Sequence, residues 1–225
     1  MRRLILPLTF GILGTAILLS LGSWQVRRLA WKENVLAQID RQIAAEPVAL
    51  PVELDPDADK FLAVTVQGLI TQDEVHVLAS TRDTGAIYRV IAAFETTDGR
   101  RVLLDRGWVY PPSKDAQRPM VQTTVQGNLH WPQEVDSYTP ENDTNANIWF
   151  SRHVPTLAKA LDTEEILVVA RSTTEKDPQV TPLPVASSGI PNDHLQYAVT
   201  WYGLAAVWVM MTLYYLRRMR KQKKV

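Results

Sequence analysis

The sequence contains no cysteine, and this absence excludes several kinds of chemistry. Without a thiol the chain has no disulfide, no thiolate nucleophile and no Cys-ligated zinc or copper site. It also lacks a Gly-x-Ser-x-Gly nucleophile elbow and a glycine-rich nucleotide loop, so a hydrolase or an oxidoreductase has little support. The spacing of its four histidines is not that of a zinc site; they are His76, His130, His153 and His194. We therefore expect a protein that is not an enzyme.

Charged side chains are absent from two long runs, residues 4–23 and residues 195–216. At 1.5 Å per residue these runs form helices of about 30 and 33 Å, which matches the hydrocarbon core of a membrane. A signal peptide has a shorter apolar stretch, and the residues from Gly22 to Gln25 do not form a small-x-small cleavage site. We therefore predict two membrane spans, of which the first is an uncleaved anchor.

Acidic residues are absent from both ends of the chain. All 24 lie between Glu33 and Asp193, and because only 16 basic residues lie between the two runs, this region has a net charge of −8. The other eight basic residues are Arg2, Arg3, Arg217, Arg218, Arg220, Lys221, Lys223 and Lys224. Because Lys and Arg gather on the cytoplasmic side of membranes, we predict that both termini are cytoplasmic and that the central domain is periplasmic. No Arg- and Ser-rich transit segment precedes the first run, so we expect a bacterial inner-membrane protein. Arg27, Arg28 and Lys32 argue mildly for the opposite orientation, but the C-terminal cluster outweighs them. An acidic outer domain is not expected to bind nucleic acid.

Apolar spacing and prolines divide the chain into segments. We predict a first transmembrane helix (1–23), a helical stalk (24–46), a periplasmic β-rich domain (47–194), a second transmembrane helix (195–216) and a basic cytoplasmic tail (217–225). The stalk is expected to end before Pro47, because proline disfavours the helical conformation of the residue before it. Residues 47–59 are predicted to form a loop.

Short apolar segments between turn residues predict the strands of the central domain. The predicted strands are 61–70, 75–78, 90–96, 101–109, 121–129 and 166–170, with a turn at Gln72-Asp73 and a short helix at Pro155–Leu161. Asp98-Gly99 is typical of a hairpin turn that needs φ > 0. We expect Gly107 at a bulge, Trp108 in the core, and a semi-extended proline-rich strap from Gln179 to Pro191. The predicted fold is a membrane α+β protein whose two transmembrane helices flank a small, mainly antiparallel β domain, barrel- or sandwich-like, that protects its edges.

Small residues on the two predicted spans favour close helix packing. They are Gly11, Thr15 and Gly22 on the first span, and Gly203 and Ala206 on the second. Such packing suits any hairpin anchor equally well.

His194 differs from the other histidines because it directly precedes the second uncharged run. Asn192 or Asp193 is expected to cap the helix there. A helical spacing places His194, Tyr197, Ala198, Trp201 and Ala205 on one face. The same aromatic residues, together with Trp24 and Trp31, also suit an interfacial belt that any two-span protein has.

Several motifs in this order resemble those of the Surfeit locus protein 1 family. The first is Leu21-Gly22-x-Trp24-Gln25-x-x-Arg28-x-x-Trp31-Lys32, and the last is Asn192-Asp193-His194-Leu195-Gln196-Tyr197. Between them lie Gly85 and Tyr88, the run from Asp105 to Val109, and Pro140-Glu141-Asn142 before Trp149. The resemblance therefore extends over nearly the whole chain. One departure is His153, where relatives more often have an acidic residue.

The resemblance implies a function in the biogenesis of haem-copper cytochrome c oxidase. It implies binding of haem A, with His194 as the iron ligand. The helical face shared by His194, Tyr197 and Trp201 is then the expected seat of the porphyrin edge. Trp24 and Arg28 are expected as further haem contacts, with simple anchoring of the helix as their alternative. The isoprenoid tail of haem A is expected between the helices in lipid, and the propionates towards Arg27, Arg28 or Lys32. The expected partners are membrane lipid and the catalytic subunit of the oxidase, with haem A synthase as a further candidate. The alternative is a haem-independent scaffold that binds oxidase subunits during assembly.

Overall fold

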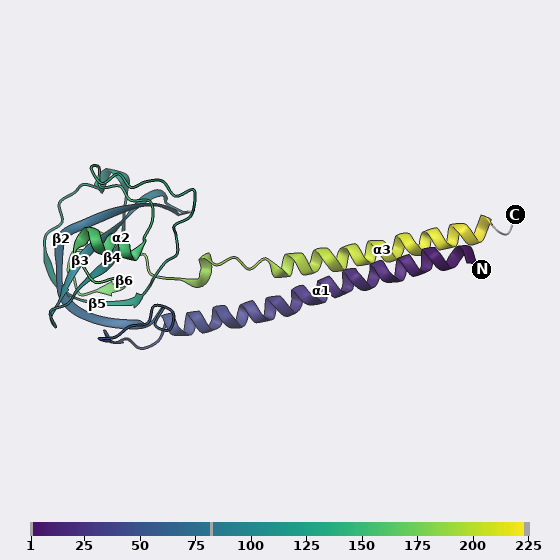
Figure 1. Cartoon of the computed structure of the whole chain (residues 1–225), viewed down its shortest axis with the longest axis horizontal. Coiled ribbons are helices and arrows are strands. Elements are labelled where there is room, and N and C mark those ends of the chain that lie inside the picture. Colours follow the sequence, from purple (N-terminus) through teal and green to yellow (C-terminus); the bar gives the residue numbers. More distant parts are fainter. Residues whose placement is uncertain (1, 82, 223–225) are drawn as a thin grey trace. The chain divides into compact units, whose positions relative to one another are not determined.

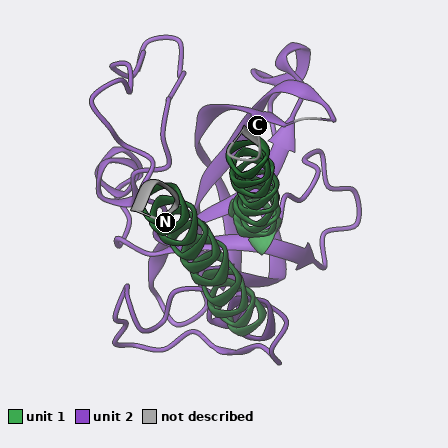
Figure 2. Cartoon of the chain, turned by 90° about the vertical axis from the view of Figure 1, so that its right-hand side faces the viewer, with its two compact units in different colours: residues 1–38, 187–225 green, residues 39–186 purple. Residues whose placement is uncertain are grey.

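The computed structural model describes residues 2–81 and 83–222. Arg82, Lys223 and Lys224 lie outside the described residues, as do the side chains of Arg2 and Arg3. The chain divides into two compact units (Figure 2). One joins Met1–Gln38 to Ser187–Val225, and the other is Ile39–Ala186.

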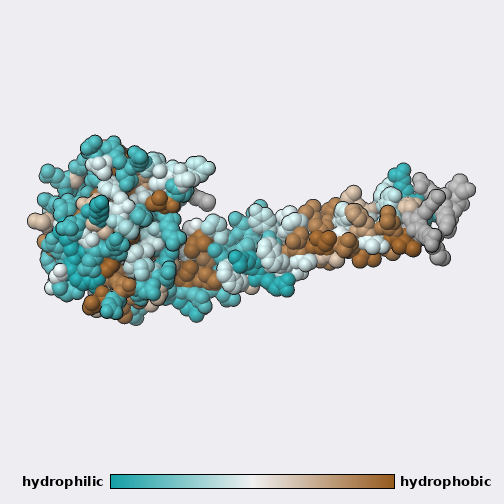
Figure 3. Space-filling view, viewed as in Figure 1, coloured by the Kyte–Doolittle hydropathy of each residue, from teal (hydrophilic) through white to brown (hydrophobic). Residues whose placement is uncertain are grey.

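The first unit contains most of α1 (Arg2–Ile43) and all of α3 (His194–Gln222), two long helices that lie side by side (Figure 1). The predicted span and stalk are thus one continuous helix, which ends shortly before Pro47 as expected. Apolar side chains cover much of the outside of the pair (Figure 3), and large ones such as Leu6 and Val199 are mostly exposed. Both helices are long and apolar enough to cross a membrane. The unit is therefore compatible with membrane insertion.

The second unit is a six-stranded mixed sheet with one short helix, α2 (Val154–Leu161). The strands are β1 (Val48–Ala49), β2 (Ala63–Thr81), β3 (Gly85–Thr96), β4 (Arg101–Val109), β5 (Val121–Leu129) and β6 (Leu167–Thr173). Their order is β1-β2-β3-β4-β6-β5, with an additional pairing of β2 with β5. Four pairings are antiparallel, whereas β1–β2 and β4–β6 are parallel. The predicted barrel or sandwich stays a prediction.

Two predictions at the start of the sheet are wrong. Residues 48–49, expected in a loop, form β1 and pair with β2. The predicted turn at Gln72-Asp73 does not separate two strands, because β2 continues through it with a register shift between Ile70 and Glu74. The Thr71 hydroxyl donates to the Ala93 carbonyl at 3.0 Å, so this irregularity stays hydrogen-bonded to β3 and the long strand is not interrupted.

The predicted hairpin and bulge are confirmed. Gly99 has φ +85° in the turn between β3 and β4. At Gly107, where φ is +122°, the β3–β4 register shifts, and a Cβ atom would overlap the carbonyl of Thr181. Trp108 exchanges two backbone hydrogen bonds with Thr181, at 2.8 and 3.0 Å, so the proline-rich strap crosses β4 at the bulge. The expectation for the Trp108 side chain is wrong: it is only half-buried, and its ring meets Tyr110 edge to face.

The core has two main clusters of buried side chains. One lies within the sheet and includes Phe94, Leu104 and Leu129. The other joins the sheet to α2 through residues such as Leu103 and Leu157. α2 buries four apolar residues at helical spacing, which explains why so short a helix is stable here.

Candidate functional site

The two long helices pack antiparallel through glycines of α1. Each of three glycines lies so close to α3 that an added Cβ would come within 3.0 Å of a side chain. The pairs are Gly11 with Thr212, Gly14 with Trp208, and Gly22 with Tyr202. The indole N–H of Trp208 also donates to the Gly11 carbonyl at 3.1 Å. Small residues let the helix backbones approach, and these contacts set the register of the pair.

The prediction for α3 itself needs correction. A Cβ added at Gly203 would meet no described atom within 4 Å, and Ala206 is exposed, so neither residue lies in the helix contact. The buried small residues are instead Ala198 and Ala205, each 3% exposed. They lie one heptad apart, a spacing typical of packed helix pairs. The predicted role of Gly11 and Gly22 is confirmed.

His194 is the first residue of α3 and makes one hydrogen bond to α1. Its Nδ1 lies 2.8 Å from Oε1 of Gln25, which is only 8% exposed. The imidazole is half-buried, and its Nε2 makes no hydrogen bond to any residue that the structure describes. Asn192, two residues earlier, has a buried Oδ1 with no partner among the described residues. The end of the helix pair therefore presents an imidazole nitrogen that is open to a ligand, beside a buried amide oxygen without a partner in the described residues.

The other four residues predicted to contact haem A are not closely grouped around His194. Tyr197 is 54% exposed and Trp24 is 52% exposed, whereas Trp201 is half-buried. None of the three makes a hydrogen bond or a ring contact with His194 in the described part of the chain. Arg28 is exposed, with its guanidinium 3.9 Å from the ring centroid of Trp31. The structure thus brings His194 together with Gln25, a residue that the helical-face argument did not single out.

Positive charge follows Gln25 along α1. Arg27, Arg28 and Lys32 form no ion pair with any described residue, and Arg28 lies about 4.5 Å further along the helix axis than Gln25. The stacking of Arg28 on Trp31 holds one guanidinium over an aromatic face while leaving its N–H groups available. These cations are suited to an anionic group beside the helix pair.

An apolar groove of about 410 Å³ lies between α1 and α3. Its lining residues are Gly14, Ile17, Leu18, Leu204, Val207, Trp208 and Met211. Leu204 lies about 15 Å along α3 from His194 at helical rise. The groove therefore offers apolar space that an extended hydrocarbon chain starting beside His194 can reach.

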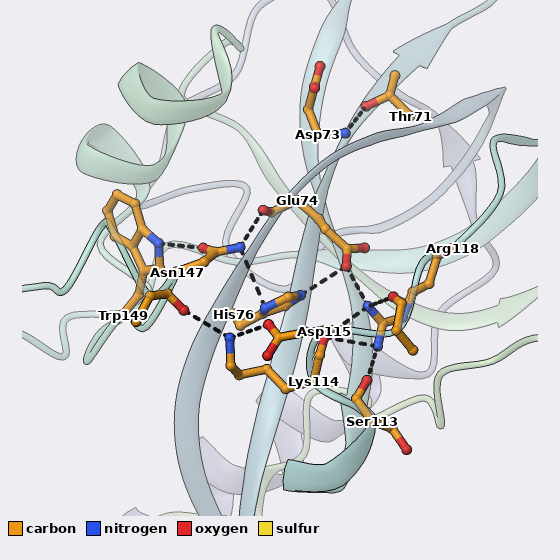
Figure 4. Close-up of polar contacts among 12 residues, drawn as sticks. Thr71, Asp73, Glu74, His76, Ser113, Lys114, Asp115, Arg118, Asn147 and Trp149 are labelled. Atoms are coloured by element: carbon orange, nitrogen blue, oxygen red, sulfur yellow. Dashed lines mark hydrogen bonds and ion pairs between the residues drawn. The ribbon is translucent and has the colours of Figure 1, made fainter.

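The sheet unit has a polar cluster of its own around Glu74 (Figure 4). His76 Nε2 and Arg118 Nη1 lie 2.9 and 2.5 Å from the same Glu74 oxygen, and the Asn147 amide donates to the Glu74 carbonyl at 3.0 Å. Burial alone would raise the pKa of Glu74, but the hydrogen bond from His76 and the charge of Arg118 lower it. The cluster ties β2 to the segments that carry Arg118 and Asn147. His76 is thus a hydrogen-bonded structural histidine.

His130 is also structural. Its ring stacks on Phe61 with centroids 5.3 Å apart, and its Nδ1 is buried with no partner among the described residues. Burial, followed by the charges of Arg152 and Lys60, lowers the pKa of His130 to about 4. His153 lies at the start of α2, with its Nδ1 2.6 Å from the Thr156 hydroxyl. Neither ring adjoins a group of three or more metal-ligating side chains in the described residues.

The pKa of His130 predicts a pH-dependent stability. Between about pH 6.5 and pH 4 the unfolded chain is protonated at His130 while the folded chain is not, so the free energy of unfolding should fall as the pH falls. The expected loss is about 3 kcal/mol over this range. Urea unfolding of the full chain in detergent at several pH values would measure it. The H130Q variant should show a flatter curve, and an unchanged curve would contradict the assignment.

Comparison with known proteins identifies the chain. The model of the SURF1 family matches residues 12–206, which include the sheet unit, most of α1 and the first part of α3. The chain belongs to the SURF1 family.

Relatives within the SURF1 family align over most of this chain. Human Surfeit locus protein 1 is 28% identical over 213 residues, covering 83% of this chain and 69% of the human protein. The SURF1-like protein of Rickettsia conorii is 27% identical over 219 residues, covering 90% and 88%. Surfeit locus protein 1 of Takifugu rubripes is 30% identical over 231 residues, covering 88% and 91%. Gln25 and His194 both lie inside the segment that the SURF1 family model matches.

Proposed function

We propose that this protein is a non-catalytic assembly factor for haem-copper cytochrome c oxidase, which binds haem A through His194 and transfers it to the catalytic subunit. Membership of the SURF1 family supports a function in oxidase assembly. The observation that carries the haem site is the open Nε2 of a half-buried imidazole at the end of an apolar helix pair. Imidazole is a common axial ligand of haem iron.

The surroundings of His194 fit the three chemical parts of haem A. Trp24 and Tyr197 offer exposed aromatic surface beside a porphyrin, and Arg27 and Arg28 are cations suited to its propionates. The groove lined by Gly14 and Leu204 is apolar, as an isoprenoid tail requires. Because each buried methylene contributes about 0.8 kcal/mol, the tail favours a site at membrane depth.

A carrier must release what it binds. One protein ligand to the iron, with the opposite axial position open, suits transfer better than two strong ligands would. Haem A synthase is a suitable donor and the oxidase catalytic subunit a suitable acceptor, since both handle the same hydrophobic group. Membrane lipid is the remaining partner, in contact with the apolar outer surfaces of α1 and α3.

The charge distribution supports a location in the inner membrane with the sheet unit on the periplasmic side. The region between the helices has a net charge of −8, whereas α3 ends in Arg217, Arg218, Arg220 and Lys221. Basic residues at membrane boundaries favour the cytoplasm. Both termini would then be cytoplasmic, and His194 would lie near the outer surface of the membrane.

The function is tested by purifying the full chain in detergent from cells that make haem A and from matched cells that do not. We expect a haem A absorption spectrum only in the first preparation, and the oxidase catalytic subunit to co-purify from those cells. A protein that captures the subunit equally from both cell types and carries no haem in either would support the haem-independent scaffold instead.

A further inference from the structure

Gln25 is a buried polar residue in the contact between the two long helices. It lies on the same side of α1 as Gly11 and Gly22, at the heptad-like spacing of a packed helix stripe. A buried amide without a hydrogen bond is costly in apolar surroundings. The partner of this amide is the His194 imidazole, at 2.8 Å and 169 residues away in the sequence.

We propose that Gln25 is the positioning residue of His194: its amide oxygen holds the imidazole proton on Nδ1 and so keeps Nε2 free for iron. The inference rests on the proposed binding of haem A through His194. In this proposal Gln25 affects haem binding by orienting His194, and Gln25 itself does not contact haem.

The chemistry of the two groups sets the direction of the hydrogen bond. The Oε1 atom of Gln25 only accepts, so Nδ1 of His194 must donate. A neutral imidazole carries one N–H, and with the proton on Nδ1 the lone pair is on Nε2. A histidine that ligates metal in a protein commonly donates its other N–H to a carbonyl or a carboxylate, which fixes the ring orientation and raises the basicity of the ligating nitrogen.

Packing holds this hydrogen bond in place. Gly22, one turn before Gln25, lies against the ring of Tyr202, and the Tyr202 hydroxyl is 3.1 Å from the Ser23 hydroxyl. Tyr202 is itself about two turns along α3 from His194. The helix register that places Gln25 opposite His194 is therefore set by neighbouring contacts. A substitution at Gln25 that preserves these contacts should leave the helix pair assembled.

The first test uses the full chain without haem, labelled with ¹⁵N-histidine, in detergent well above the ordinary imidazole pKa of about 6.5. The ¹⁵N shifts of His194 should report the Nδ1–H tautomer in the wild type. We expect Q25L to lose this preference and Q25E to keep it, because a carboxylate also accepts from Nδ1–H. The matched control is Q196L, which replaces an exposed glutamine of α3. A wild-type ring protonated on Nε2, or a Q25L ring identical to the wild type, would overturn the proposal.

The second test measures haem A affinity and the absorption spectrum of the same variants. Loss of a hydrogen-bonding partner of a metal ligand typically weakens binding 10–100-fold, and we expect Q25L to fall in this range. Q25E and Q196L should bind as the wild type does, with Q25E showing a lower reduction potential. Wild-type affinity and spectrum in Q25L would overturn the positioning role.

The two tests separate the inference from the proposed function. If the wild type binds no haem A, or if H194A binds it unchanged, His194 is not the iron ligand and Gln25 has no role towards iron. The tautomer measurement still reports whether the hydrogen bond between Gln25 and His194 exists. If H194A loses haem but Q25L does not, the proposed function stands and the inference fails. Circular dichroism and gel filtration of Q25L and Q25E would show that the helix pair is intact.

Discussion

H194A is expected to purify without haem A from cells that load the wild-type protein. The substitution removes the imidazole at the end of the helix pair, and the described structure offers no second histidine on either long helix. Haem binding would then depend on apolar, aromatic and propionate contacts without an iron ligand, and we expect affinity to fall by on the order of 100-fold or more. Haem content per chain and the absorption spectrum are the measurements.

The matched control for this variant is H153A, which removes a histidine of the sheet unit that contacts Thr156. It should retain the wild-type haem content. Helix packing should survive in H194A, because the glycine contacts of α1 with Tyr202, Trp208 and Thr212 do not involve residue 194. Unchanged haem content and spectrum in H194A would remove this residue from the ligand role.

The sequence predicted a helix or strand correctly where a single pattern marked that element. Charge-free runs indicated both long helices, and β5 begins and ends at the predicted residues. β1 was missed because two residues, Val48 and Ala49, carry no periodicity and owe their conformation to pairing with β2. The length of β2 was missed because Gln72-Asp73 resembles a turn, whereas the hydrogen bonds to β3 resume at Glu74.

The candidate site was predictable in part. His194 stood out because it adjoins an apolar run, but Gln25 did not, since the sequence does not reveal which α1 residue lies opposite it. A signal was present in the spacing of Gly11, Leu18, Gly22 and Gln25, which follows a heptad pattern. A polar residue in such a stripe indicates a buried hydrogen bond. Tyr197 was grouped with His194 by helical spacing, yet it is mostly exposed, because α1 covers the side of α3 that carries Ala198 and Ala205.

D105A is expected to destabilise the sheet unit by about 3–5 kcal/mol. Asp105 is fully buried in β4 and accepts hydrogen bonds from Arg89 at 2.8 Å and from the Gly107 backbone N–H at 3.1 Å. Arg152 Nη1 lies 3.6 Å from the same carboxylate. Removal of Asp105 leaves the largely buried Arg89 guanidinium without its carboxylate, whereas Arg152 keeps Glu134, and it frees the bulge at Gly107. Urea unfolding of the full chain in detergent, followed by tryptophan fluorescence, would measure the loss.

Two further variants test whether an unpaired buried charge causes the loss of stability in D105A. In D115A the lost carboxylate is exposed and, among the described residues, forms an ion pair with Lys114 alone, so the unfolding midpoint of this variant should stay close to that of the wild type. The double variant R89M/D105L removes both members of the buried pair and should be more stable than D105A, because no charge is then stranded beside β3. If the double variant were as unstable as the sum of its single variants, the cost would not come from the unpaired charge of Arg89. In that case the Asp105 carboxylate would matter through its hydrogen bond to Gly107, where the strap crosses the sheet.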